Sequence, residues 1–254
     1  MATKSITGTR GLSVRERRQR NHDEMRAGVL SVARDIMREQ GAAALSLNEI
    51  ARRVGITPPA LYTYFPSKMA LYDVLYRTGI RLFCEAEEEL RRTMAPDWAR
   101  VHAWFAQRVA LAEAHPDLYH LVFDVPIPGF VPSPESLEEV RHLYDATVHD
   151  IAELIEAGSM RPNLPPEQAT DLLIAMRLGI VAAHIGKHRQ LPPPERLARL
   201  VPEAVAILRA AWEPTNNGSR QDGAGEGRSI PIRSVPGDHE GGGPAERGAH
   251  HRHG

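Results

Sequence analysis

Apolar side chains recur at intervals of three and four residues along most of the first 212 positions, as in amphipathic α-helices. Prolines and glycines interrupt this pattern at its boundaries, where helices start and stop. The pattern predicts an all-α protein. The predicted helices cover about residues 21–40, 47–54, 58–65, 67–92, 96–115, 116–124, 133–157, 165–188 and 193–212.

The stretch from Ser46 to Lys68 predicts two short helices joined by a tight turn. Ser46 and Glu49 have the spacing of a capping box at the start of the first helix. Gly55 stands where this helix must stop, and glycine accepts the left-handed backbone that such a stop needs. Thr57 can cap the second helix, with Pro58 in its first turn.

The two faces of the second short helix differ in character. Leu61 and Phe65 are four residues apart and are expected to point inward, whereas Pro59, Tyr62 and Thr63 are left on the opposite side. This arrangement is typical of a helix-turn-helix, whose second helix enters the major groove of DNA. The alternative is a helical hairpin in a bundle that does not bind DNA.

The segment resembles the DNA-binding domain of the TetR (tetracycline repressor-like) family of bacterial transcription regulators. The resemblance rests on LSLNEIARRVGI, ALYTYF and PSKMALYDVLY, and it covers roughly residues 22–77. It implies an N-terminal three-helix DNA-binding domain, which a long helix joins to a C-terminal helical ligand-binding and dimerisation domain. The expected organisation is a flexible basic arm (1–20), the DNA-binding domain (21–66), the regulatory and dimerisation domain (67–212) and a disordered tail (213–254).

Several side chains around the turn suit contact with DNA. Hydroxyl groups can bond base edges, and small apolar groups suit the thymine methyl. The resemblance adds Asn48, which can pair with adenine, and phosphate contacts from Tyr64 and Lys68; Pro58 replaces a position that is often polar in the family. The predicted DNA-binding residues are Asn48, Thr57, Pro59, Ala60, Tyr62, Thr63, Tyr64 and Lys68.

Charge is distributed unevenly along the chain. Residues 1–80 hold 13 Lys and Arg against 7 Asp and Glu, a net charge of +6, whereas the remainder has a net charge of −7. A basic front and an acidic rear suit a protein that presents one end to phosphates. Within the front, Arg15, Arg17, Arg18 and Arg20 form either the first turns of a helix, a basic arm along DNA, or a solvated charge run. Arg52 and Arg53 are further candidates for phosphate contact.

The C-terminal half offers aromatic and histidine side chains but no catalytic pattern. An apolar loop at 125–134 is expected to cover other residues. Small-molecule sites are apolar with few polar groups, although aromatic stripes at helical spacing also form ordinary cores. The predicted ligand-pocket residues are Phe83, His102, Trp104, Phe105, Tyr119, Phe123, Tyr144 and His184.

A strip of small residues on the predicted helix 165–188 would let another helix approach closely. In the family, the last two long helices pair with their copies in a second subunit, and packing within the chain is the alternative. The tentative dimer-interface residues are Ala175, Gly179, Ala182, Ala183 and Gly186.

Other function classes find little support. Nucleophile–base constellations and cofactor motifs are absent at recognisable spacing, and His184 and His188 lack further ligands for a metal site. The single cysteine, the lack of a secretory signal and the short apolar runs favour a soluble cytoplasmic protein.

The sequence thus predicts a homodimeric DNA-binding regulator without cofactor or metal. The expected mechanism is a repressor released from a palindromic operator by a small apolar effector. A constitutive DNA-binding protein and, less favoured, an enzyme in the helical domain are the alternatives.

Overall fold

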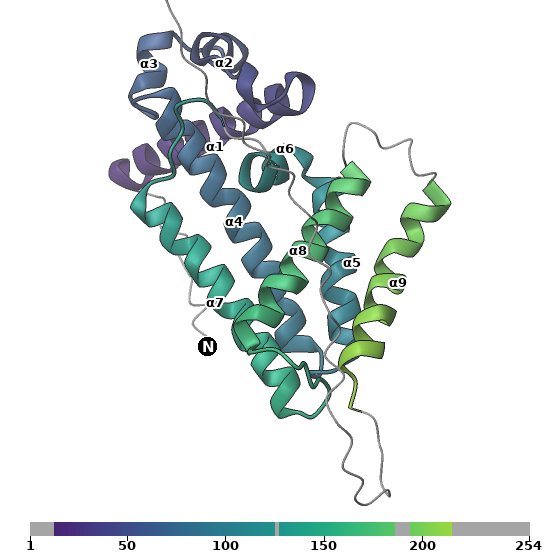
Figure 1. Ribbon diagram of the computed structural model, residues 1–254. Helices are drawn as coiled ribbons and strands as arrows, with labels where there is room; N and C mark the ends of the chain where they lie inside the picture. Colours follow the sequence, from purple (N-terminus) through teal and green to yellow (C-terminus); the bar gives the residue numbers. More distant parts are fainter. Residues whose placement is uncertain (1–12, 125–126, 186–193, 215–254) are drawn as a thin grey trace, which may run out of the picture. The chain divides into compact units, whose positions relative to one another are not determined.

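The computed structural model describes residues 13–124, 127–185 and 194–214 of the chain (Figure 1). All regular elements in these ranges are helical, which confirms the predicted fold class. Gly186, His188 and the predicted disordered tail, apart from residues 213 and 214, lie outside the described residues. The α-helices are α1 (Val14–Gln40), α2 (Leu47–Val54), α3 (Pro58–Tyr62), α4 (Lys68–Thr93), α5 (Trp98–Ala114), α6 (Pro116–Tyr119), α7 (Pro134–Glu156), α8 (Pro166–Ile185) and α9 (Pro194–Trp212).

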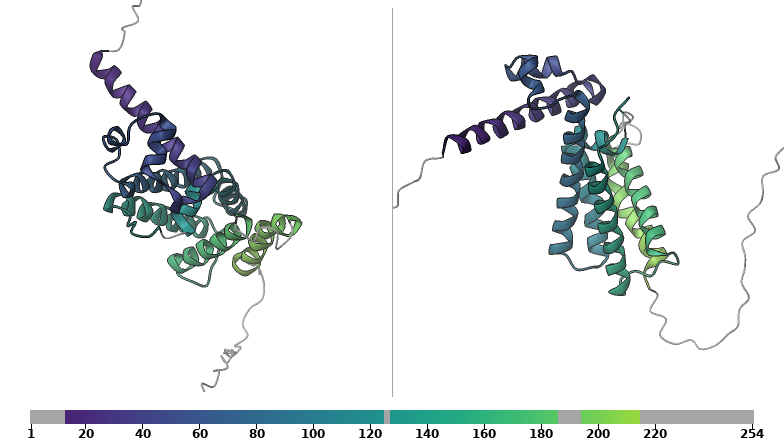
Figure 2. Two further views of the ribbon diagram at one scale, coloured as in Figure 1. Left: turned by 90° about the horizontal axis from the view of Figure 1, so that it is seen from above. Right: turned by 90° about the vertical axis from the view of Figure 1, so that its left-hand side faces the viewer.

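Two single turns complete the described elements. A 3₁₀ turn, η1 (Ala42–Ala44), leads into α2, and a π-helical turn, η2 (His120–Asp124), continues α6. Helices α1, α2 and α3 and the first turns of α4 pack around one apolar core (Figure 2). Its fully buried members include Val29, Ile50, Leu61, Phe65 and Tyr72.

Local capping explains where most of these N-terminal helices begin and end. Gly55 ends α2 in the left-handed conformation at φ 81°, as predicted. The Thr57 hydroxyl accepts a hydrogen bond from the Ala60 amide, and the Ser67 hydroxyl accepts one from the Ala70 amide. These bonds satisfy amides at the starts of α3 and α4, so both helices begin at the predicted residues.

Two predictions about helix starts need correction. Ser46 precedes α2 but its side chain makes no capping bond, and the Glu49 carboxylate bonds Arg52 and Arg53 rather than the start of the helix. Residues 14–20 were predicted within a flexible arm, yet they are the first turns of α1. The capping box sits here, between Ser13 and Glu16, and it supplies the missing hydrogen bonds of that helix start.

Helix α4 contributes to both halves of the molecule. Leu71 and Leu75 are buried in the N-terminal core, and Phe83 is buried in the second core. The helix is continuous through Gly79. A Cβ atom at Gly79 would lie 2.7 Å from Cγ2 of Val122, so glycine is needed there for the close approach of η2.

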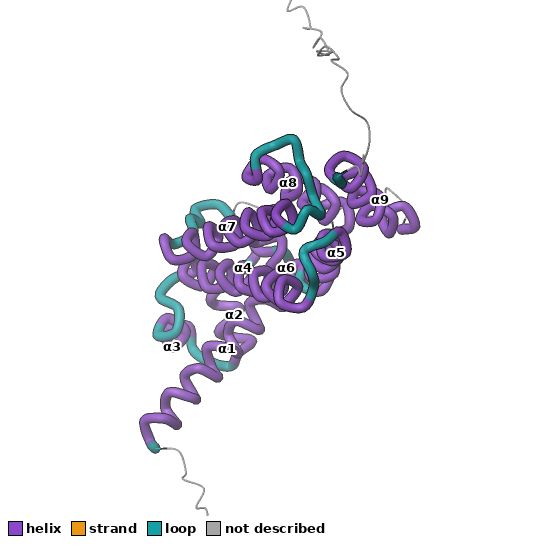
Figure 3. Tube along the Cα trace, turned by 90° about the horizontal axis from the view of Figure 1, so that it is seen from below, coloured by secondary structure: helices purple, strands orange, loops and turns teal. Residues whose placement is uncertain are grey.

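Helices α5, α7, α8 and α9 pack with the second half of α4 around the larger core. Figure 3 shows helices and loops, without strands, throughout the described residues. The described part of the 125–134 loop lies against the N-terminal core: Ile127 is buried, and the Phe130 ring is 5.8 Å from the rings of both Tyr72 and Tyr76. The loop therefore covers α4 near the helix-turn-helix.

Candidate DNA-binding surface and regulatory core

Helix α3 presents a polar and partly apolar face to solvent. Leu61 is fully buried and fixes the helix on the N-terminal core, while Tyr62 on the other side is 51% exposed. Asn48, Thr57, Pro59 and Thr63 are also exposed, and Ala60 is half-buried. The Thr63 hydroxyl donates to the Ala60 carbonyl at 2.6 Å, which leaves its lone pairs free to accept. The structure thus brings the predicted base-reading residues onto one surface.

Arg52 and Arg53, considered for phosphate contact, are engaged within the protein. Arg52 Nη2 lies 2.7 Å from Glu49 Oε1, and Arg53 bonds both Glu49 and Glu39. Hydrogen bonds from Arg52 and then Arg53 lower the pKa of Glu49 to about 2. The Arg53–Glu39 pair ties the end of α2 to α1.

The junction between α3 and α4 is held by α1. The Tyr64 ring lies 4.9 Å from the His22 ring, and Arg26 Nη1 donates to the Tyr64 carbonyl at 3.0 Å. Lys68 Nζ lies 3.4 Å from the Ala43 carbonyl oxygen and 5.4 Å from the Tyr72 ring centroid. Tyr64 and Lys68, the predicted phosphate contacts, are both half-buried and therefore held in place by neighbouring residues.

An ionic cluster joins α1 to the start of α6. The Asp117 carboxylate is fully buried and accepts hydrogen bonds from Arg34 Nε at 2.6 Å and from Arg38 Nε at 3.1 Å. Arg34 Nη2 is 3.0 Å from His115 Nδ1. Burial, followed by the charge of Arg34, lowers the pKa of His115. The sequence pattern did not predict this connection, because Asp117 looks like an ordinary acidic residue at a helix start.

A second ionic cluster lies inside the regulatory core. Glu87 on α4 accepts hydrogen bonds from Arg108 on α5 and from Arg177 on α8, the latter at 2.8 Å. All three side chains are at least nine-tenths buried. Burial alone would raise the pKa of Glu87, but Arg177 and Arg108 outweigh it and lower that pKa. Burial and the neighbouring Arg177 lower the pKa of Arg108 to about 10, so it stays charged at pH 7.

Aromatic rings surround the two buried arginines. The Arg108 guanidinium lies 4.4 Å from the Phe83 centroid and 5.4 Å from the Phe123 centroid, and that of Arg177 lies 5.2 Å from the Trp104 ring. Tyr119 packs on Phe83 and Phe123. Five predicted pocket residues thus share one core: Phe83, Trp104, Phe105, Tyr119 and Phe123.

The other three predicted pocket residues differ in burial. His102 is exposed. Tyr144 is half-buried and its hydroxyl donates to Asp171 at 3.0 Å, whereas His184 is buried with its Nδ1 2.9 Å from the Ile180 carbonyl of its own helix. Within the described residues, no three metal-ligating side chains gather closely enough to hold an ion.

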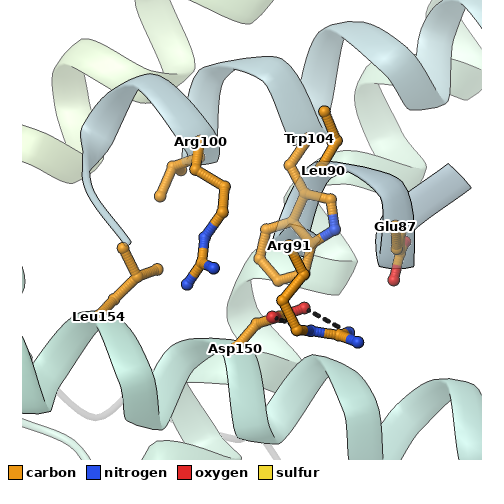
Figure 4. A pocket seen from close by; sticks show the side chains of 8 residues that line it. Glu87, Leu90, Arg91, Arg100, Trp104, Asp150 and Leu154 are labelled. Atoms are coloured by element: carbon orange, nitrogen blue, oxygen red, sulfur yellow. Dashed lines mark hydrogen bonds and ion pairs between the residues drawn. The ribbon is translucent and has the colours of Figure 1, made fainter. Parts of the chain in front are cut away.

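The space beside the buried cluster is small. A cavity of about 10 Å³ is lined by Glu87, Arg100 and Trp104 among others, beside the Arg91–Asp150 ion pair (Figure 4). Such a volume holds about one water molecule, whereas small-molecule pockets measure about 300–1,000 Å³. Beside this ion pair, the described side chains therefore leave room for about one water molecule, and the ligand pocket stays a prediction.

Helix α8 exposes an apolar strip. Ala175, Gly179 and Ala182 are exposed, Ala183 is half-buried, and Leu172 on the same face is 42% exposed. A Cβ atom added at Gly179 would have no neighbour within 4 Å. Among the described helices, α8 is the one long and apolar enough to cross a membrane by length and composition.

The fold and the exposed face of α3 define a protein of the helix-turn-helix DNA-binding class. Residues 29–75 match the family model for bacterial regulatory proteins of the tetR family. Within these residues, the chain is thus similar to the DNA-binding domain of this family.

Two curated relatives are helix-turn-helix regulators. The transcriptional activator FasR of Mycolicibacterium smegmatis is 26% identical over 137 residues, which cover 54% of this chain and 61% of that protein. The transcriptional regulator Rv1816 of Mycobacterium tuberculosis is 26% identical over 148 residues, which cover 57% of this chain and 63% of that protein. The match spans about three fifths of the length of these relatives.

Solved structures share the fold. The regulatory protein SCO4313 superposes with a TM-score of 0.63 at 24% identity, covering 76% of this chain and 98% of the other. The ketosteroid transcriptional regulator KstR2 of M. tuberculosis superposes with a TM-score of 0.56 at 19% identity, covering 74% of this chain and 95% of the other. FadR of Bacillus subtilis, solved in complex with stearoyl-CoA, superposes with a TM-score of 0.56 at 13% identity. The superposition covers 72% of this chain and 96% of the other.

Proposed function

We propose that this protein is a sequence-specific transcriptional regulator that binds a near-palindromic operator as a homodimer and acts as a repressor. The observation that carries the proposal is the exposed face of α3, held on the N-terminal core by Leu61. One short reading helix gives limited affinity, so two copies on two half-sites are expected. The names of the relatives describe regulators, and we propose no catalytic role.

Activation is the second candidate for the direction of regulation, because the relative FasR is named an activator. Transcript levels of the neighbouring genes in a deletion strain separate the two. A repressor predicts a rise in operator-controlled transcripts, whereas an activator predicts a fall.

Two substitutions at the DNA surface should have different effects. Lys68→Ala should weaken binding to all duplexes and reduce the salt slope by about 1 per protomer, because it removes a phosphate contact. Asn48→Ala should relax preference at one base pair per half-site, with a loss of about 1–3 kcal/mol on the best operator. Mobility-shift titrations over a series of operators and salt concentrations measure both effects.

Arg92→Ala is the matched control for loss of a positive charge. Arg92 is exposed at the far end of α4 and is paired with Glu89 at 2.7 Å. It should leave affinity and salt slope unchanged. Unchanged operator affinity for both Lys68→Ala and Asn48→Ala would show that α3 does not dock as proposed.

The exposed strip on α8 supports a homodimer. Small side chains allow another helix to come close, and Ile207 on α9 adds an apolar side chain that is 65% exposed. A second copy of α8 and α9 would cover these residues. Sedimentation of the purified protein should therefore give the mass of two chains.

The dimer also accounts for the apolar character of α8 without a membrane. The helix packs against α5, α7 and α9, and it carries Arg177 into the buried ionic cluster. A charged residue at the centre of a bilayer is costly. These features support a cytoplasmic location.

A small apolar effector is the proposed signal. KstR2 is described as a ketosteroid transcriptional regulator, and FadR was solved in complex with stearoyl-CoA, so one protein of the same fold binds an acyl-CoA. Beside Trp104 the described core leaves room for about one water molecule, so a ligand bound there must move the surrounding helices. Binding then opposes DNA binding only as far as the ligand prefers the open state.

A screen of steroid-like and acyl compounds for release of operator DNA tests the effector proposal. An active compound should release the DNA, and DNA should weaken its binding by the same factor. The alternative is a constitutive DNA-binding protein without an effector. Failure of every compound to release DNA, together with an unchanged core in a structure solved with them, would favour that alternative.

A further inference from the structure

The first three turns of α1 lie outside the N-terminal core. Every residue from 14 to 24 is exposed, and the first fully buried side chain of the helix is Val29. Both views in Figure 2 show these turns extending beyond the other helices of the N-terminal domain. A segment that buries no apolar surface gains little from folding, so its helical start depends on the Ser13–Glu16 capping box and on continuity with the rest of α1.

One face of this extension continues the face that contacts the helix-turn-helix. At 100° per residue, Arg15, Arg18, His22 and Arg26 fall on the same side of α1. His22 touches Tyr64, and Arg26 bonds the Tyr64 carbonyl. Arg18 and Arg15 thus follow His22 along this face toward the N-terminus of α1. They lie beyond Tyr64, which is a predicted phosphate contact.

The charges on this face are not neutralised within the protein. The Glu16 carboxylate accepts a hydrogen bond from the Ser13 amide. Arg20 Nε lies 3.5 Å from Glu24 Oε1. Arg15, Arg17 and Arg18 form no ion pair with any described residue. The extension therefore presents free guanidinium groups, which suit phosphate oxygens.

We propose that Arg15 and Arg18 bind phosphates of duplex DNA outside the base pairs read by α3. The inference rests on the proposed DNA-binding function and extends the surface along the operator. Four and seven residues of helix place Arg18 and Arg15 about 6 Å and about 10 Å beyond His22. This corresponds to about two and three base pairs at 3.4 Å each. The flanking DNA is thus part of the binding site.

The opposite face of the same helix supplies a matched control. Arg17 and Arg20 lie about 200° and 140° around α1 from Arg15, so they point away from the contact face. The double variants Arg15→Ala/Arg18→Ala and Arg17→Ala/Arg20→Ala remove equal charge from one segment. Alanine is the best helix former, so neither variant should unfold these turns, and circular dichroism verifies this.

The experiment compares two duplexes. An operator is first selected by the full chain from random DNA, then trimmed to the half-sites alone or extended by six base pairs at each end. The wild type should bind the extended duplex more tightly. The Arg15→Ala/Arg18→Ala variant should lose about ten- to a hundredfold affinity for the extended duplex, with a salt slope lower by about 3–4 for the dimer, and should bind the trimmed duplex as the wild type does.

Two results would overturn the proposal. One is equal binding of wild type and Arg15→Ala/Arg18→Ala to the extended duplex; the other is an equal loss in the Arg17→Ala/Arg20→Ala control, which would show a nonspecific charge effect. Failure of the proposed function looks different, because the wild type would then select no duplex at all.

Discussion

Glu87→Gln is expected to lower the free energy of unfolding by about 3–5 kcal/mol, because it leaves Arg108 and Arg177 buried without a counter-charge. Glutamine has nearly the shape of glutamate, so packing changes little and charge is the main loss. Urea unfolding at a fixed protein concentration measures the effect. Glu89→Gln is the control, since this residue on the same helix is 54% exposed and should change stability by less than about 0.5 kcal/mol.

The same substitution should change the pH dependence of stability. The pKa of Glu87 is lowered in the folded protein, so its contribution is complete above the ordinary carboxyl pKa of about 4.3. That contribution is lost as pH falls through the lowered pKa. The Gln variant should therefore lose less stability than the wild type below about pH 4. A variant as stable as the wild type at pH 7 would show that the cluster is not a net support of the fold.

Gly179→Arg should separate the proposed dimer while sparing the protomer. No atom lies within 4 Å of the added Cβ position, and replacing glycine inside a helix gains up to about 1 kcal/mol of helix propensity. The long charged side chain would prevent a second α8 from approaching. Sedimentation should then show a monomer, and operator affinity should fall by about 10²–10⁴ because the two half-sites are no longer bound together.

Ala110→Arg provides the control for the added charge and bulk. Ala110 is exposed on α5, away from the strip. This variant should remain a dimer with wild-type operator affinity. A dimeric Gly179→Arg protein with full affinity would place the subunit contact on another surface.

The helix-turn-helix was predictable because its signals are local. Gly55, Thr57 and Ser67 act on backbone groups within three or four residues, so the boundaries of α2, α3 and α4 follow from nearby chemistry. The family match at residues 29–75 covers the same stretch. The capping box predicted at Ser46 does not form, and the Glu49 carboxylate that it needs has charged partners in Arg52 and Arg53.

The ionic clusters could not be found from the pattern of residues. Glu87, Arg108 and Arg177 stand on three different helices, and each looks like a solvent-exposed charge on an amphipathic helix. The same holds for Asp117 and its partners on α1. Their burial depends on how the helices cross, which is set by contacts between residues distant in the sequence.

The regulatory core shows the same division. Apolar spacing specified that Phe83, Trp104 and Phe123 turn inward, because burial of apolar surface drives helix packing. Whether inward-facing rings line a cavity or fill it depends on the distances between α4, α5 and α8, since a shift of a few ångströms opens or closes the space. Helix packing leaves about 10 Å³ beside Trp104, and periodicity along one chain carries no information on that distance.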